Sequence, residues 1–340
     1  MSFAMFFRSI KYIVLALLVC IPIACVGNSG DRLPATSPQA GRDFRVAIVL
    51  PEAIDGDAWS QAGHQGLKLI EAQLQAEVEY AEIDRKSPED IKKILRQYAR
   101  EGFDFIIGHG SQHLTLPALE VAAKEFPRSK FAAIGGGGFG NNHNLGVLQV
   151  RDGELGYLAG VVAALKTKTN KIGYIGGFDY ATLQEEAALL ERGAKATKPA
   201  VEVAIRWLGG WTDVAKADAI ARELMASGVD LFVLHGDPAT LPLYPILAKV
   251  GIAIIGWNTD QYERSPDAVI TSGIVKIPEL LLAGATLVRE GRWEGRKYRL
   301  GLREGVLELA PFRGALTPEQ EEIVQRAKDE ILLGKIDVMP

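Results

Sequence analysis

Aromatic, acidic and amide residues gather at the places where predicted β-strands end. They form six short stretches, at residues 57–61, 109–113, 176–179, 211–213, 235–240 and 257–261. Aromatic faces can clamp a flat apolar group, while a few directed hydrogen bonds fix its polar edge. This mixture predicts a binding site for a neutral polar ligand that has a flat apolar part.

The first of these stretches has two interpretations. It follows a predicted buried strand at 44–50 and leads into a helix, which is where open α/β sheets bind ligands. Asp57 and Trp59 would then contact the ligand. Alternatively, Asp57 only caps the helix and Trp59 only packs against it.

Catalytic and metal-site motifs offer little support for an enzyme. The sequence contains no Gly-x-Ser-x-Gly elbow, no His-Glu-x-x-His and no Gly-x4-Gly-Lys-Ser/Thr phosphate loop. The four glycines at 135–138 lack the Lys-Ser/Thr that would follow in a phosphate loop. His109 and His113 are four residues apart, but they lie in a glycine-rich loop, so we expect neither a metal site nor a cofactor.

The elements that carry these stretches alternate between strand and helix. We expect strands at 44–50, 78–83, 103–108, 130–135, 146–150, 171–177, 201–207, 230–236, 253–257 and 268–274, with helices between most of them. Such alternation predicts parallel sheets with right-handed crossovers, here two doubly wound lobes of an α/β protein. A helix at 278–291, a hairpin-like piece at 298–309 and a helix at 317–333 complete the chain.

We expect the last third of the chain to be shared between the lobes. The first lobe would contain 43–150 plus about 260–295, and the second 151–259 plus about 296–340. A hinge is expected near Val150 and near Trp257 and Asn258, and closure of the lobes on the ligand would bend it.

Composition bounds the class of protein. The 340 residues are 48% hydrophobic and 24% charged, with a formal net charge of −4. The chain can therefore bury two real cores, and without a basic block it is not expected to bind nucleic acid. Both cysteines, Cys20 and Cys25, precede residue 26, so a disulfide framework is not expected either.

The N-terminus has the pattern of a targeting segment. Arg8 and Lys11 precede an apolar run at 12–24 that is short for a membrane span. Small Ala24 before Cys25 resembles the lipobox of bacterial lipoproteins, whereas bulky Val19 precedes Cys20. We expect a signal peptide at 1–24, lipidation at Cys25 and a flexible tether at 25–42 that is rich in Gly, Ser, Pro and Asn.

From about Phe44 to the end, the chain resembles the basic membrane protein (Bmp) family, purine nucleoside receptor-like lipoproteins that are substrate-binding components of ABC transporters. The matching segments are at 57–62, 66–67, 108–110, 131–132, 154–160, 167–177, 256–261, 271–272 and 334–338. The run at 167–177 and the pair Asp260-Gln261 are the most specific. The resemblance implies a type I periplasmic-binding-protein fold, with a ligand held in the cleft between the lobes.

The resemblance also implies roles for residues. In nucleoside-binding relatives two aromatic rings sandwich the base, and Trp59 and Trp211 match these positions. Asp57 and Gln61 fit near the base, and Asp260 near the ribose hydroxyls. The chain departs from the family pattern at Ser60, at Gln112 with His113, at Asp237 and at Lys276. The full set of expected ligand-binding residues is Asp57, Trp59, Ser60, Gln61, His109, Gln112, Trp211, Asp237, Asp260 and Lys276.

The expected protein is thus a monomeric, non-catalytic receptor for a purine nucleoside or nucleobase. It would be lipid-anchored to the cell membrane on its extracytoplasmic side and would partner an ABC transporter permease. Three alternatives stay open: a receptor for another small polar ligand such as a sugar, a nucleoside hydrolase, and a ligand-sensing lipoprotein without a transporter.

Overall fold

The computed structural model describes residues 43–338, except 56–57, 84–85, 111, 136–137 and 139, and except the side chains of 112–114. The expected signal peptide, tether and lipidation site at Cys25 lie outside this part of the chain, as does Asp57. Within the described residues, no helix is both long enough and apolar enough to cross a membrane.

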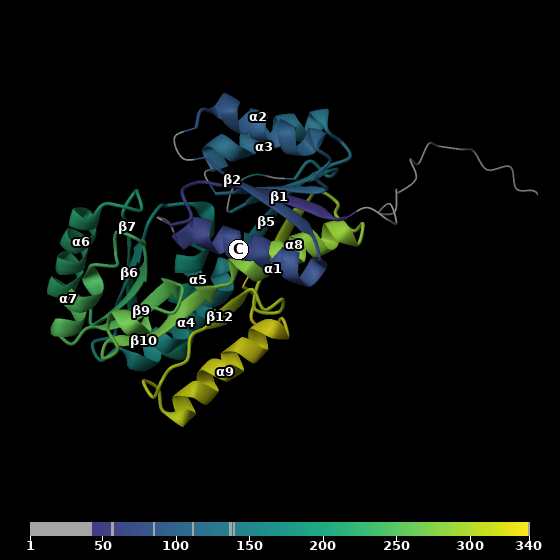
Figure 1. Cartoon of the computed structure of the whole chain (residues 1–340). Coiled ribbons are helices and arrows are strands. Elements are labelled where there is room, and N and C mark those ends of the chain that lie inside the picture. The colour runs from purple at the N-terminus through teal and green to yellow at the C-terminus, as the bar shows by residue number, and fades with distance from the viewer. Residues whose placement is uncertain are drawn as a thin grey trace, which may run out of the picture. The chain divides into compact units, whose positions relative to one another are not determined.

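The first lobe is built on a six-stranded parallel sheet in the order β11-β5-β4-β3-β1-β2. The strands are β1 (Arg45–Leu50), β2 (Glu77–Glu82), β3 (Phe105–His109), β4 (Lys130–Ile134), β5 (Leu145–Val150) and β11 (Lys297–Leu300). Helices α1 (Ala58–Leu74) and α8 (Ile277–Arg289) cover one face, and α2 (Pro88–Arg100) and α3 (Gln112–Glu125) the other (Figure 1). Along β1, Ile48 packs towards α1 and α8 whereas Val49 packs towards α2 and α3, because successive side chains of a strand point to opposite faces.

The second lobe repeats this plan, with strand order β12-β10-β9-β8-β6-β7. Its strands are β6 (Lys171–Gly176), β7 (Glu202–Trp207), β8 (Leu231–His235), β9 (Ala253–Asn258), β10 (Val269–Val275) and β12 (Leu307–Leu309), the last of them antiparallel to β10. Its helices are α4 (Asp152–Lys166), α5 (Ala181–Thr197) and α9 (Pro318–Leu332) on one face, α6 (Val214–Ala226) and α7 (Leu243–Lys249) on the other, and the 3-10 turn η1 (Tyr262–Arg264). The expected fold, two doubly wound lobes of the type I periplasmic-binding-protein class, is confirmed.

Small residues bring α4 and α5 into backbone contact. A Cβ atom on Gly160 would lie 2.0 Å from the carbonyl oxygen of Leu190, and one on Gly193 would lie 2.1 Å from that of Tyr157. Any larger side chain would push the two helices apart. This close packing fixes the position of α5, which carries Glu185 and Glu186.

The C-terminal third differs from the sequence expectation. Residues 298–309 do not form a hairpin: β11 pairs with β5 in the first sheet, and β12 pairs with β10 in the second. Likewise β10 belongs to the second sheet, although 260–295 was expected in the first lobe. A strand's own residues show that it is a strand, but its partner is set by long-range packing.

Within the described residues the chain passes between the lobes at 150–152, 275–277 and 300–307. The expected hinge near Val150 coincides with the first passage. The expected hinge at Trp257 and Asn258 does not, because β9 and β10 are neighbours in one sheet.

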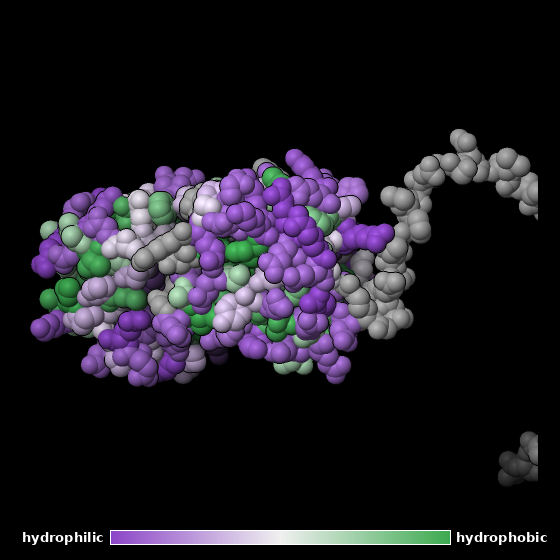
Figure 2. Space-filling view, turned by 45° about the horizontal axis from the view of Figure 1, so that its top comes forward, coloured by the Kyte–Doolittle hydropathy of each residue, from purple (hydrophilic) through white to green (hydrophobic). Residues whose placement is uncertain are grey.

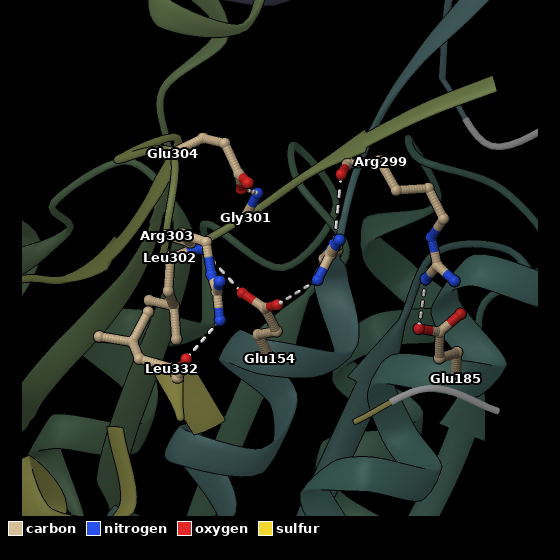
Figure 3. Close-up of polar contacts among 9 residues, drawn as sticks. Glu154, Glu185, Arg299, Gly301, Leu302, Arg303, Glu304 and Leu332 are labelled. Carbon is tan, nitrogen blue, oxygen red and sulfur yellow. Dashed lines mark hydrogen bonds and ion pairs between the residues drawn. The ribbon is translucent and has the colours of Figure 1, made fainter. Parts of the chain in front are cut away.

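Polar contacts connect the first and third of these passages (Figure 3). The carboxylate of Glu154, at the start of α4, accepts a hydrogen bond from the backbone N–H of Leu302 at 2.7 Å and pairs with Arg151 at 3.3 Å. Arg299 of β11 reaches across to Glu185 of α5, with 2.5 Å between Nη2 and Oε1. Because β11 lies in the first sheet and α5 on the second, this ion pair joins the two lobes.

The surface is mostly polar where Figure 2 shows it. Hydrophilic residues cover most of this face, and hydrophobic residues form small areas between them. Large exposed hydrophobic residues such as Val250 and Leu333 are far apart in the sequence and lie on or just after different helices. Singly scattered apolar residues of this kind are normal on a protein surface.

Candidate ligand-binding site

The strand order of each sheet reverses at one point, and ligands of open α/β sheets bind at that point beyond the carboxyl ends of the strands. In the first sheet the order reverses between β1 and β3, and in the second between β6 and β8. Trp59 lies in the first turn of α1, after β1, and His109 is the last residue of β3. Phe178 follows β6, His235 is the last residue of β8, and Trp211 lies on the loop after β7.

In the first lobe, Trp59 is stacked on His109. The ring centroids are 4.6 Å apart and the planes differ by 8°. His109 is fully buried, and its Nε2 is 2.7 Å from the carbonyl oxygen of Trp59. Gly110, at φ +81°, lets the backbone approach the indole, since a Cβ there would lie 2.7 Å from Nε1. His109 therefore supports the half-buried Trp59 from behind and fixes its ring.

The next two residues of α1 differ in environment. Ser60 is fully buried, and its hydroxyl accepts a hydrogen bond from the backbone N–H of Glu52 at 3.1 Å. This bond ties the loop after β1 to the first turn of α1. Gln61 is exposed.

In the second lobe, aromatic rings gather around Trp211. Phe178 meets it edge-on, with centroids 5.6 Å apart, and the ring of His235 lies 6.1 Å away, tilted by 45°. A Cβ on Gly177 would lie 2.2 Å from the indole, so only glycine allows this approach. Ala239 donates its N–H to the carbonyl of Trp211 at 2.8 Å, which holds the loop against the end of β8.

A buried polar cluster lies behind these rings. Glu186 of α5 is fully buried and accepts hydrogen bonds from the hydroxyl of Tyr174 at 2.8 Å and from Nδ1 of His235 at 2.9 Å. The other face of His235 is stacked on the buried ring of Trp257, with centroids 5.2 Å apart. Glu186 is not among the residues expected from the sequence, although it is an acid in the apolar stripe formed by Leu183 and Leu190.

Charges in this cluster shift one another's pKa values. Burial alone would lower the pKa of His235, but the charge and hydrogen bond of Glu186 raise it above its ordinary value. Burial, then repulsion by Glu186, raises the pKa of Asp152 to about 8. At neutral pH the cluster thus favours a charged imidazolium beside Glu186 and a neutral carboxyl at Asp152.

Asp237 and Gln261 belong to a network that shapes the loops after β8 and β9. Asp237 accepts a hydrogen bond from the Thr240 hydroxyl at 3.1 Å, and burial raises its pKa. Gln261 is 5% exposed and donates to the carbonyl of Trp257 at 3.2 Å. Gln261, one of the two residues of the Asp260-Gln261 pair, is therefore buried and hydrogen-bonded within the protein.

The remaining expected residues have charged partners or lie outside the described part of the chain. Asp260 pairs with Arg313 at 2.5 Å, and Lys276 pairs with Glu308 at 2.7 Å. Asp57 and the side chain of Gln112 fall outside the described residues. In the described part of the chain, no three His, Cys, Asp or Glu side chains are grouped so that they could hold a metal ion.

Comparisons with known proteins extend this description. The family described as "ABC transporter substrate-binding protein PnrA-like" (Bmp) matches residues 44–338. The transcriptional activator protein Med of Bacillus subtilis (strain 168) is 27% identical over 278 residues, which cover 81% of this chain and 84% of Med. The ABC transporter nucleoside-binding protein BmpA of Lactococcus lactis subsp. cremoris (strain MG1363) is 26% identical over 324 residues, with 89% and 91% covered.

Among solved structures, a transcriptional activator of the comK gene from Bacillus halodurans has the same fold. It superposes with a TM-score of 0.74 at 24% identity and covers 85% of this chain and 97% of its own. The family match extends over almost all of the described residues. The chain therefore belongs to the Bmp family of PnrA-like proteins and is a substrate-binding protein of an ABC transporter.

Proposed function

We propose that this protein binds a purine nucleoside or nucleobase between its two lobes and delivers it to the permease of an ABC importer. The observation that carries the proposal is the placement of Trp59 and Trp211. Each lies at the carboxyl edge of a different sheet, close to the point where strand order reverses, and each is half-buried. Two such rings suit a flat heterocycle, which stacks favourably on aromatic faces.

The other expected site residues take supporting roles in this proposal. Asp57 and Gln61 bond the edge of the base, with Gln112 nearby, while His109 and Ser60 hold the first turn of α1 in place. Asp260 accepts a ribose hydroxyl. A carboxylate has about four lone-pair sites, so Asp260 can keep Arg313 and still accept this bond.

Asp237 and Lys276 complete the proposed second-lobe side of the site. Asp237 lies on the loop directly after β8, beside Gln261. Lys276 follows β10, where the chain passes back to the first lobe. Lys276 already pairs with Glu308 at 2.7 Å, so a ligand oxygen would share the ammonium rather than take it over.

Family membership supports both the proposed ligand and the proposal that the protein is not an enzyme. The Lactococcus relative is named as a nucleoside-binding protein, and the matched family is described as substrate-binding proteins of ABC transporters. We assign no catalytic residue, cofactor or metal to this chain.

We also propose how the protein is anchored and which segments form its lobes and hinge. Residues 1–24 form a signal peptide, Cys25 carries the lipid, and 25–42 tether a monomer to the outer side of the cytoplasmic membrane. The first lobe consists of 43–150 with α8 and β11, and the second of the remaining elements from α4 onwards. The three passages between them form the hinge.

The direct test is mass spectrometry of the ligand that copurifies with the protein, followed by calorimetry with nucleosides, bases and sugars. A purine nucleoside or base should copurify and bind. Selective binding of a sugar would reject the proposal in favour of the sugar receptor. Release of free base from inosine during incubation would instead identify a hydrolase.

A sensory role is the second candidate, because the Bacillus relative Med is named as a transcriptional activator. A pull-down from membranes separates the two roles. Recovery of a permease with the ligand-loaded protein supports transport, whereas recovery of a signalling protein without a permease supports sensing.

A further inference from the structure

His235 occupies an unusual position for a buried histidine. It ends β8 at the point where strand order reverses, it is 7% exposed, and its ring lies between Trp211 and Trp257. Its Nδ1 faces the protein interior and bonds both carboxylate oxygens of Glu186, at 2.9 and 3.0 Å. The opposite ring nitrogen, Nε2, hydrogen-bonds to no described residue and is not sealed from solvent. A ligand at the carboxyl edge of this sheet can therefore reach it.

The surroundings of His235 decide which protons its ring carries. Among the described residues, Glu186 hydrogen-bonds only to Tyr174 and His235, and no Lys or Arg side chain reaches it. The charges of Asp152 at the start of α4 and of Asp237 after β8 also act on His235, and those of Glu185 and Arg299 act on Asp152. A fully buried carboxylate needs a positive partner. The imidazolium is that partner, and it carries a proton on Nε2 as well as on Nδ1.

We propose that His235 determines ligand specificity by donating a hydrogen bond from Nε2 to the 6-oxo group of a purine. The inference rests on the proposed function and names its substrate class as 6-oxopurine nucleosides. A 6-oxopurine presents two acceptors, O6 and N7, on one edge, whereas a 6-aminopurine places a donor beside N7. A cationic donor meets the first edge favourably and repels the amino group of the second. Glu186 and Tyr174 act as positioning residues, because they fix the ring and its protons without touching the ligand.

The test measures inosine and adenosine binding by calorimetry from pH 5.5 to 8.5. The wild type should bind inosine about ten- to a hundredfold more tightly than adenosine, as expected for a bond to a charged donor. Inosine affinity should fall as pH rises through the pKa of His235, because Nε2 then loses its proton. His235→Gln should abolish most of the preference, while His143→Gln, an exposed control just before β5, should leave it unchanged.

Glu186→Gln separates positioning from general damage. Glutamine still accepts the Nδ1 proton but no longer stabilises the cation, so the pH midpoint of inosine binding should move to lower pH. The nuclear magnetic resonance titration of His235 in the ligand-free wild type, assigned from the contacts of its ring with Trp211 and Trp257, should show a midpoint above 6.5. This measurement needs no variant to bind ligand, so it holds even if His235→Gln or Glu186→Gln is unstable.

The two proposals can fail separately. If the wild type binds no purine nucleoside, the proposed function fails, and this inference with it. If the wild type binds nucleosides but prefers adenosine, or shows no pH dependence, or titrates His235 below 6.5, this inference alone is overturned.

Discussion

Truncation of Trp59 to alanine tests the proposed base clamp most directly. The indole is half-buried and stacks on His109 at 4.6 Å, and a base on its free face would form the second stack. Stacking of a base on an aromatic ring contributes about 1–3 kcal/mol. Since about 1.4 kcal/mol corresponds to a factor of ten, Trp59→Ala should weaken inosine binding by roughly ten- to a hundredfold.

The same variant should cost little stability. The bond between Nε2 of His109 and residue 59 goes to the backbone carbonyl, so it survives the truncation. The lost stack on His109 is worth about 0.5–1.5 kcal/mol beyond the burial of the ring, and because the indole is only half-buried, the total loss should stay below that of a core tryptophan. Trp59→Phe keeps a stacking ring and should retain most of the affinity.

Trp293 provides the matched control. It is 5% exposed, stacks on Tyr298 at 4.7 Å and donates from Nε1 to the carbonyl of Asn144 at 3.1 Å. Trp293→Ala should cost about 3–5 kcal/mol of folding free energy, as is typical of core tryptophans. The affinity of the folded fraction should stay the same. Melting temperature and calorimetry on both variants decide the matter: a Trp59→Ala protein that melts much lower but binds inosine normally would refute the clamp.

Three further predictions concern other parts of the molecule. In the native protein the carboxyl of Asp152 holds its proton up to a pKa of about 8, whereas in the unfolded chain it loses it near 3.8, so wild-type stability should fall as pH rises from 4 to 8. Asp152→Asn cannot ionise, so the melting temperature of this variant should fall less over the same pH range. Melting curves of the two proteins that shift in parallel with pH would contradict this. Arg299→Met should cost about 3 kcal/mol in urea unfolding, because Glu185 is left nearly buried without a counter-charge. Added Glu185→Gln should restore much of that loss, and no recovery would show that the loss does not come from an unpaired Glu185. Cys25→Ala should release the protein from the membrane fraction; retention with an unmodified Cys25 would exclude the lipid anchor.

Local sequence patterns were sufficient for most strands and helices. The run at 44–50 and the segment 171–177 became β1 and β6 almost as expected, because an apolar run bounded by Pro51 or glycines is a local property. The pattern missed the short helix α7, whose seven residues are too few for a clear period. It also misjudged 298–309, since nothing local distinguishes a hairpin from two strands that pair with different sheets.

The positions of the candidate site residues at strand ends could be predicted from the sequence, but their contacts could not. The sequence by itself determined which residues follow strand ends, because parallel strands bring their carboxyl ends to one edge, and so it located Trp59, His109 and Trp211. Only the tertiary structure decided which partner each side chain has. Glu186 is distant in sequence from His235, yet the packing of α5 on the second sheet brings the two within 2.9 Å. Likewise Arg313 reaches Asp260 from another loop. Such pairings depend on long-range packing and on the burial of charge, and neither is encoded in the spacing of residues along the chain.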